Sequence, residues 1–256
     1  MSRILFAGES WSVTSIHTKG FDSFTTVEYA EGADHLLTGL RGAGHDVTYM
    51  PSHVAARQFP ATVAELQSYD AVVLSDIGAN TLLIPPTTFS RGERAPNRLD
   101  ALRDWTLAGG GLAMIGGYLT FQGIEAKANY RNTVLADVLP VEMELGDDRE
   151  ECPQGVHPRS AGDHPLVAGL DAEWPAILGF QRLVARDGAH VAATVGEHPL
   201  LVVGHAGEGR SLAYATDIGP HWAPEAFTSW DGFATLWDRA MRWLAGETVE
   251  ARAAAA

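Results

Sequence analysis

Short runs of apolar residues alternate, in the first half of the chain, with segments whose apolar residues recur at helical spacing. The apolar runs predict buried strands at 4–8, 46–50, 71–76 and 109–115. The amphipathic segments predict helices at 33–43, 62–68 and 98–108, and the polar or proline-rich segments predict loops at 9–22 and 85–96. Such alternation is typical of βαβ units around a mostly parallel sheet.

The second half of the chain has a different pattern. Residues 129–139 predict a helix that ends at Pro140, and the acidic segment at about 142–165 is interpreted as an insertion. Later segments predict strands at 191–195, 200–204 and 211–217, a hairpin turn at 207–209 and a closing helix at 233–245. The sequence therefore predicts one three-layer α/β domain over 1–248, with a mostly parallel central sheet, a β-rich C-terminal extension and a disordered tail at 249–256.

Composition narrows the classes of partner. The 256 residues include 18 basic and 32 acidic side chains, for a formal net charge of −14, which argues against a nucleic-acid partner. No apolar run is long enough to span a membrane and no leader pattern is present, so we expect no membrane partner and a cytoplasmic location. The single cysteine, Cys152, excludes an intramolecular disulfide, and no histidine spacing predicts a metal site. We expect neither a metal nor another cofactor.

The segment Gly116-Gly117-Tyr118-Leu119-Thr120-Phe121-Gln122 follows a glycine-flanked apolar strand and predicts a tight turn into a helix. Such an elbow lifts one side chain above the sheet edge and places backbone amides beside it as anion donors. The alternative interpretation is a buried strand that needs glycine for close packing.

This elbow and the closing segments 207–222 and 242–246 together resemble the class I glutamine amidotransferase-like superfamily. The resemblance is closer to its divergent glutamine amidotransferase-like and ThuA-like branches, and it covers most of the chain. It implies a flavodoxin-like central sheet. In the amidotransferases a late strand is followed by His-Pro-Glu; here His221 has the matching place, but the acid is displaced to Glu225.

The resemblance also implies a degenerate nucleophile site, because Tyr118 stands where the amidotransferases carry a cysteine. Their glutamine hydrolysis passes through a thioester, and a phenol with a pKa of about 10 is a poor replacement for a thiolate. Cys152 lies beside Glu150 and Glu151, whose charges raise the pKa of a thiol. Glutaminase activity of the usual kind is therefore not expected, although a conventional glutaminase that uses Cys152 stays as an alternative.

Ligands of open α/β sheets bind where loops converge at the carboxyl ends of the strands. This rule selects a set rich in titratable groups. The candidate catalytic residues are acids or bases, with a tyrosine as a polarising group: His221, Tyr118, Glu9 and His17. The candidate ligand-binding residues are Trp11, His53, Asp76, Gly78, Gly117 and Asp217, with the amides around the two glycines as an anion pocket. Each histidine has the alternative role of a hydrogen bond to loop backbone.

Two hypotheses of different classes follow. In the first, the protein is an enzyme, a hydrolase or lyase, or a former enzyme, that acts on a small polar molecule without a cysteine thioester. In the second, it is a metabolite-binding or assembly module without catalysis, in which sheet edges and the late tryptophans support a homo-oligomer. Convergence of Glu9, His17, Tyr118 and His221 around an accessible cleft favours the enzyme.

Overall fold

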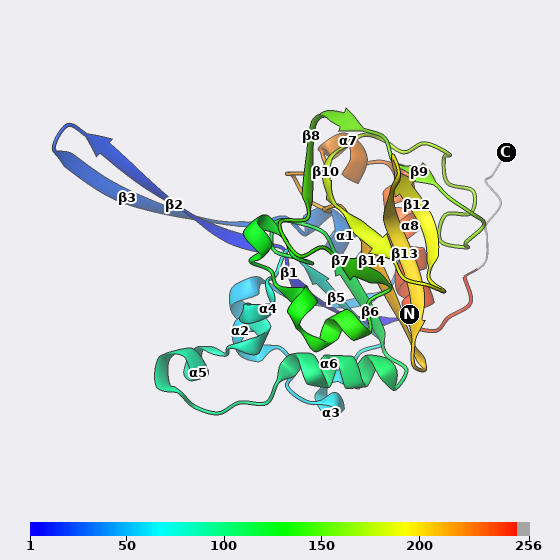
Figure 1. Ribbon diagram of the computed structural model, residues 1–256, viewed down its shortest axis with the longest axis horizontal. Helices are drawn as coiled ribbons and strands as arrows, with labels where there is room; N and C mark the ends of the chain where they lie inside the picture. The colour runs from blue at the N-terminus through cyan, green and yellow to red at the C-terminus, as the bar shows by residue number, and fades with distance from the viewer. Residues whose placement is uncertain (250–256) are drawn as a thin grey trace.

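The computed structural model describes residues 1–249 and is built on an eight-stranded sheet (Figure 1). Five parallel strands come first in the order β4 (Asp46–Met50), β1 (Arg3–Gly8), β5 (Ala71–Ser75), β6 (Gly111–Ile115) and β14 (Gly209–Tyr214). Three antiparallel strands extend the sheet: β13 (His198–Ala206), β12 (His190–Val195) and β9 (Arg159–Ser160). The predicted α/β fold with a mostly parallel sheet is confirmed, and the order of the parallel strands is that of flavodoxin-like folds.

Helices cover both faces of the sheet because the chain winds in both directions from β1. The crossover to β4 carries α1 (Asp34–Gly42), whereas the crossover from β5 to β6 runs the other way and carries α6 (Arg98–Leu107). Right-handed crossovers in opposite directions place their helices on opposite faces. The closing helix α8 (Asp231–Leu244) packs beside α1, and α6 packs with the short helices α3 (Val63–Leu66) and α4 (Ala79–Leu83).

The parallel strands are apolar along their whole length because both of their faces are covered. Strands β5 and β6 are entirely buried, as is β1 after Arg3. Gly8 ends β1 at a φ of 111°, and a Cβ there would overlap the carbonyl oxygen of Ser75 on the neighbouring strand. Glycine at this position lets β1 and β5 approach closely where their carboxyl ends meet.

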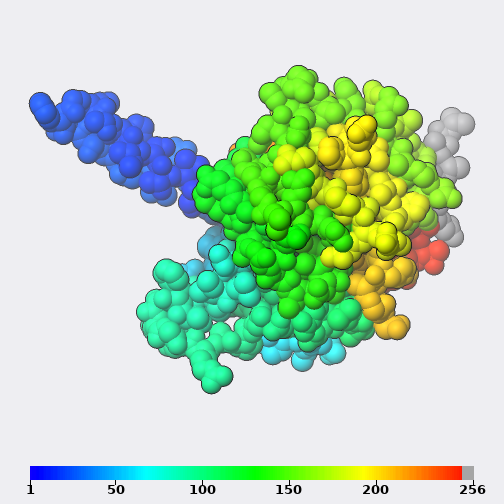
Figure 2. Space-filling view, viewed as in Figure 1, coloured from blue at the N-terminus to red at the C-terminus, as the bar shows by residue number. Residues whose placement is uncertain are grey.

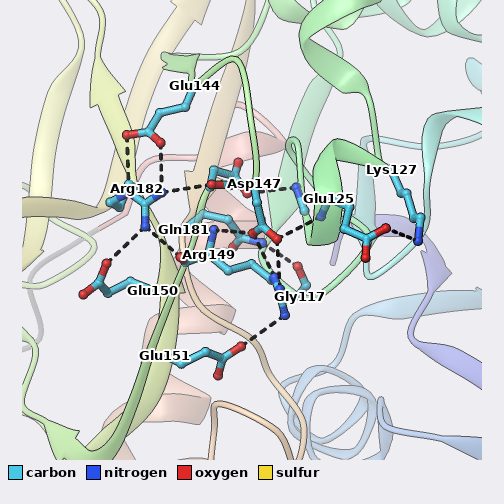
Figure 3. A network of polar contacts seen from close by, with 12 residues as sticks. Gly117, Glu125, Lys127, Glu144, Asp147, Arg149, Glu150, Glu151, Gln181 and Arg182 are labelled. Carbon is cyan, nitrogen blue, oxygen red and sulfur yellow. Dashed lines mark hydrogen bonds and ion pairs between the residues drawn. The ribbon is translucent and has the colours of Figure 1, made fainter.

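The acidic segment forms strands outside the main sheet. Strand β7 (Val141–Met143) pairs with β11 (Leu183–Ala185), and β8 (Arg149–Val156) pairs with β10 (Ile177–Gln181). Arg182 joins the two pairs, because its guanidinium contacts Glu144 at 3.0 Å and Glu150 at 3.1 Å (Figure 3). The excess of carboxylates in this segment is therefore partly neutralised by a few arginines.

Two predicted helices are absent. The predicted helix at 129–139 is instead a pair of short 3-10 helices, η2 (Tyr130–Asn132) and η3 (Val134–Asp137). After β6 the chain turns without entering an α-helix and forms only η1 (Ile124–Ala126). Positive φ angles at Phe121, Glu125 and Asn129 interrupt the helical conformation in this region.

The predicted loop at 85–96 contains a helix, and two other short helices were not predicted. The segment 85–96 includes helix α5 (Pro86–Arg91), which begins with proline at its first position, where no backbone N–H is needed. Helix α2 (Ser52–Gln58) follows β4 directly and was not predicted, and α7 (Glu225–Thr228) precedes α8. These short helices were missed because they have few apolar residues at helical spacing.

The largest departure is at 9–22, where a loop was predicted. This segment instead begins a long antiparallel hairpin of β2 (Ser10–Lys19) and β3 (Asp22–Glu31). The hairpin, called the arm below, projects from the body of the molecule as the dark blue element in Figures 1 and 2. Most of its side chains are exposed on both faces, so the alternation that marks a half-buried strand is missing from the sequence.

Within residues 1–249, no helix combines the length and hydropathy required to cross a membrane. The tail predicted at 249–256 lies, apart from its first residue, outside the described residues.

Candidate functional site

Two acidic residues mark the point in the sheet from which the chain winds in opposite directions. Glu9 follows β1 and Asp76 follows the adjacent strand β5, and both have a positive φ, of 49° and 40° respectively. The backbone N–H of Glu9 donates to the carbonyl of Ser75 at 2.7 Å, which keeps the two strand ends together. In open α/β sheets this switch point is the usual place for a ligand.

A third acid, Asp217, lies beyond the end of β14 and meets Glu9 in the interior. Their side chains are hydrogen-bonded to each other, and the residues are only 1% and 2% exposed. Burial, and then the nearby negative charges of Asp217 and Asp76, raise the pKa of Glu9 well above its usual value. Burial and the charge of Asp76 likewise raise the pKa of Asp217 to about 8. The pair therefore retains a proton at neutral pH.

Backbone and hydroxyl groups surround this carboxyl pair. The Ser75 hydroxyl donates to Glu9 Oε2 at 2.6 Å, and the amides of Ile218 and Gly219 donate to Asp217 Oδ1 at 2.7 and 3.2 Å. A Cβ at Gly32 would lie 2.7 Å from Glu9 Oε1, so glycine is required for the close approach of this loop. The surroundings hold both carboxyl groups in fixed positions.

The elbow after β6 is joined to Asp76. Asp76 Oδ1 accepts the backbone N–H of Leu119 at 2.6 Å, and the Tyr118 amide also donates to this carboxylate. A Cβ at Gly117 would lie 2.9 Å from Asp76 Oδ1, and the φ of Gly117 is 146°. Burial raises the pKa of Asp76, and these amides act against that rise. The donors expected to form an anion pocket at the elbow are therefore already paired with a side chain.

Three aromatic rings meet above the acidic groups. The Tyr118 and His221 ring centroids are 5.1 Å apart, and those of Trp11 and His221 are 5.8 Å apart. Trp222 adds a further contact with Tyr118, at 5.8 Å. Tyr118 is partly buried and His221 is exposed, so this group connects the buried acids to solvent.

Arg149 completes the surroundings of Tyr118. Its guanidinium carbon lies 4.7 Å from the centroid of the Tyr118 ring, and its own position is fixed by Asp147 and Glu151 (Figure 3). Burial and the charge of Glu151 raise the pKa of Tyr118, whereas Arg149 acts to lower it. Glu151 Oε2 also accepts the indole N–H of Trp222 at 3.1 Å.

A cavity of about 440 Å³ lies at the root of the arm, and Trp11 is one of its lining residues. Two of its lining residues are the predicted ligand-binding residues Trp11 and His53, and His53 packs edge-on against Tyr29 at 5.4 Å. The remaining lining residues are three serines, Ser10, Ser12 and Ser52. The cavity combines aromatic surface with hydroxyl groups, which suits a ligand of mixed polarity.

The structure brings most of the predicted site residues together, but not all of them. Glu9, Trp11, Asp76, Gly117, Tyr118, Asp217 and His221 form the group described above. His17 lies on the exposed arm, where its ring stacks on Phe24 at 4.6 Å. Gly78 precedes α4 and packs beside the backbone of Ala128. The structure therefore gives His17 and Gly78 no contact with the carboxyl pair.

Cys152 has the features of an unreactive thiol. It is buried on β8, and burial together with the charges of Glu150 and Glu151 raises its pKa. Among residues 1–249, no group of three or more His, Cys, Asp or Glu side chains is arranged to hold a metal ion.

Several contributors to the site were not predicted from the sequence. Arg149 and Glu151 belong to the acidic segment, which was interpreted as an insertion, and Tyr29 belongs to a strand that was not predicted. A single arginine among the acidic residues of 147–151 was the only available signal for Arg149. Ser75, the last residue of a buried strand, gave no signal at all.

The strand order and the turn after β6 are compatible with the fold of the glutamine amidotransferase-like class. A family model described as a putative glutamine amidotransferase, GATase1_like, matches residues 3–246, and the chain belongs to this family. The comparison with curated proteins found no match.

Two solved structures from Salmonella typhimurium are similar over nearly the whole chain. Cytoplasmic protein STM3548 is 46% identical, with a TM-score of 0.92, over 95% of this chain and 99% of that one. Cytoplasmic protein STM1381 is 46% identical, with a TM-score of 0.91, over 94% and 99% of the two chains. A ThuA-like protein from Parabacteroides merdae is 12% identical, with a TM-score of 0.59 over 97% and 92%, and shares the fold.

Proposed function

We propose that this protein binds a small polar molecule at the carboxyl ends of β1, β5, β6 and β14 and transfers a proton to or from it. In this proposal Glu9, with Asp217, and His221 are the proton carriers, and Tyr118 polarises the ligand through its hydroxyl. The reaction is a hydrolysis or an elimination that forms no cysteine thioester. A cytoplasmic location, as in the names of the two Salmonella proteins, is part of the proposal.

The observation that carries the proposal is the Glu9–Asp217 pair. Two carboxyl groups whose pKa values are raised by burial lie close to Asp76, and its charge raises their pKa values further. A carboxyl with a pKa near the working pH is suited to general acid–base catalysis, because it is present in both protonation states. Buried carboxyl pairs with raised pKa values also occur in proteins where they only stabilise the fold. The proposal therefore depends also on the aromatic group formed by Trp11, Tyr118 and His221.

The proposed ligand contacts the aromatic group formed by Trp11, Tyr118 and His221. Trp11 and Tyr118 flank His221, and Arg149 holds a positive charge against the outer face of Tyr118. Aromatic faces beside hydroxyl, imidazole and carboxyl groups favour a small ligand with both C–H and hydroxyl or amide surface.

A second function, ligand binding without turnover, is favoured by a different observation. The Glu9 and Asp217 carboxyls are almost completely buried, and the elbow amides are occupied by Asp76. In this case the acids hold the strand ends together, and binding takes place in the cavity lined by Trp11, Tyr29 and His53.

The experiment that separates the two functions is a screen of amino acids, amides, sugars and polyols by ligand-observed NMR, followed by a time course on each compound that binds. Under the proposal, the wild type converts a bound compound, and Glu9→Gln abolishes conversion while binding persists. His221→Ala and Tyr118→Phe are expected to reduce turnover more than binding. Binding without conversion in the wild type would overturn the catalytic proposal in favour of the binding module.

A further inference from the structure

The two faces of the arm differ in charge. Residues directly opposite in an antiparallel pair share a face, and neighbours along a strand alternate between faces. One face carries His17, Lys19, Asp22 and Glu28. The other face carries Glu31 at the root of the arm, where its carboxylate accepts the Tyr29 hydroxyl. From there to the tip this face has no charged side chain, and this uncharged part, called the open face below, consists of Ser12, Thr14, Ile16, Thr18, Ser23, Thr25, Val27 and Tyr29.

The charged face leaves less of its apolar surface exposed than the open face does, since its Val13 and Phe24 are 47% and 51% exposed. On the charged face, the His17 ring stacks on Phe24, and the Lys19 ammonium lies 5.8 Å from the same ring. On the open face, Ile16 and Val27 are 74% and 67% exposed. Exposed β-branched residues on a sheet face are typical of a surface that another element covers.

The arm is a two-stranded sheet, and a sheet of two strands is only marginally stable by itself. It pairs only β2 with β3, and within residues 1–249 no third strand joins this sheet. Two-stranded hairpins are marginally stable in water, and unpaired sheet edges invite association. Each strand has ten residues, about 33 Å at the usual rise per residue. An arm of this length therefore needs contacts from outside its own chain.

We propose that a second copy of this chain supplies those contacts, with the open faces of the two arms packed together and the arms antiparallel about a two-fold axis. The net charge of −14 makes two copies repel each other, so a self-association surface must itself lack charge. The open face meets this condition and is complementary to itself, as a two-fold interface requires. A partner selected by charge would instead use the opposite face.

Antiparallel overlap of two equal arms places the tip of each arm at the root of the other. The root contains the cavity of about 440 Å³, and its lining includes the open-face residues Ser12 and Tyr29. Phe21 is at the tip, fully exposed. The partner's Phe21 fills this cavity in the proposed dimer. Because Trp11 also lines the cavity and contacts His221, the second copy completes one wall beside the site.

The first test is the oligomeric state by light scattering after gel filtration. We expect twice the monomer mass for the wild type, and for Val27→Lys a dissociation constant raised by at least about tenfold, since each lysine would bury an unpaired ammonium group against the partner's uncharged face. Val13→Lys is the matched control, because it makes the same change on the charged face, opposite Glu28, and it should remain dimeric. A monomeric wild type, or a dimer that Val27→Lys leaves unchanged, overturns the proposal.

The second test addresses the arrangement of the arms and does not depend on the proposed catalysis. In a Cys152→Ser background, Phe21→Cys combined with His53→Cys should form an oxidised dimer, because the arm keeps its tip far from its own root (Figure 1). Phe21→Cys combined with Phe89→Cys, on the exposed helix α5, should not form one. Cross-linking by Phe21→Cys alone would show that the tips meet each other and would overturn the overlapped arrangement.

Discussion

The carboxyl groups of Glu9 and Asp217 are hydrogen-bonded to each other in the interior, although one follows the first strand of the sheet and the other follows the last parallel strand. Their contact connects the first and last parts of the sequence at the carboxyl ends of the parallel strands, where ligands of such sheets usually bind. Because both carboxyl groups avoid ionisation when buried together, their protonation depends on folding.

We expect the free energy of unfolding to fall as the pH rises from about 4 to about 8, through the contribution of Asp217. The unfolded residue loses its proton near its ordinary pKa of 3.8, whereas the folded residue retains it until about pH 8. The folded state therefore binds more protons in this range, and one such proton contributes a slope of about 1.4 kcal/mol per pH unit. Urea unfolding of the wild type and of Asp217→Asn across this range measures the contribution.

The asparagine variant is the control for titrating groups away from this pair, because it removes the Asp217 carboxyl together with its effect on the pKa of Glu9. The difference in stability between the variant and the wild type should grow in favour of the variant with rising pH. Two unfolding profiles that run parallel across the range would show that Asp217 does not hold its proton in the folded state.

We expect Tyr118→Cys to remain inactive as a glutaminase. The new thiol would be partly buried and beside Glu151, both of which raise a pKa at this position against the opposing effect of Arg149. The amides of residues 118 and 119 would still donate to Asp76. Ammonia release from glutamine should equal that of Tyr118→Ala, which has no nucleophile at this position. Release above that background would mean that the site still supports thioester chemistry.

Cys152 of the wild type should react slowly with thiol reagents. The residue is 7% exposed, and burial and two neighbouring glutamates raise its pKa. A glutamine-directed thiol alkylator should label the folded protein far more slowly than the protein unfolded in urea, and Cys152→Ser should leave ammonia release unchanged. Rapid labelling accompanied by loss of ammonia release would restore the conventional glutaminase.

Gly179→Ala should destabilise the fold by about 1–3 kcal/mol, because a methyl group at this position would overlap the indole of Trp222. The displaced indole would lose its hydrogen bond to Glu151 and its contact with Tyr118. Gly146→Ala is the matched control, since a methyl group there meets no atom within 4 Å, and it should change stability by no more than about 0.5 kcal/mol. Equal effects of the two substitutions would argue against tight packing at Gly179.

The core of the fold could be predicted from the sequence because its strands are buried on both faces. The run 71–76 is almost continuously apolar, and helix 33–43 has its apolar residues on one side. Buried positions are apolar, so the spacing of apolar residues in the sequence indicates the strand or helix. The arm could not be predicted in the same way, since neither of its faces packs against the body. Its pattern depends on contacts outside the single chain.

The candidate site was only partly predictable for a related reason. Glu9 and Asp76 stand directly after strands and Asp217 three residues after one, and the approximate position of a strand end can be predicted from the sequence. The hydrogen bond between Glu9 and Asp217, and the contact of Arg149 with Tyr118, depend on how distant segments pack. His17 was misplaced because the strand that carries it was taken for a loop close to the sheet.

The positive φ angles of Glu9 and Asp76 also limit how the protein can change. An L-residue with a side chain is destabilised in this conformation, typically by about 1–3 kcal/mol, and glycine would remove that cost together with the carboxyl group. Glycine at either position should therefore give a more stable backbone but a site without one of its acids. The same glycines would also leave the Leu119 amide and the Ser75 hydroxyl without their acceptors, at a cost of about 1–3 kcal/mol each. The strained backbone and the hydrogen bonds of these acids therefore offset each other, so neither acid can be exchanged for its backbone conformation alone.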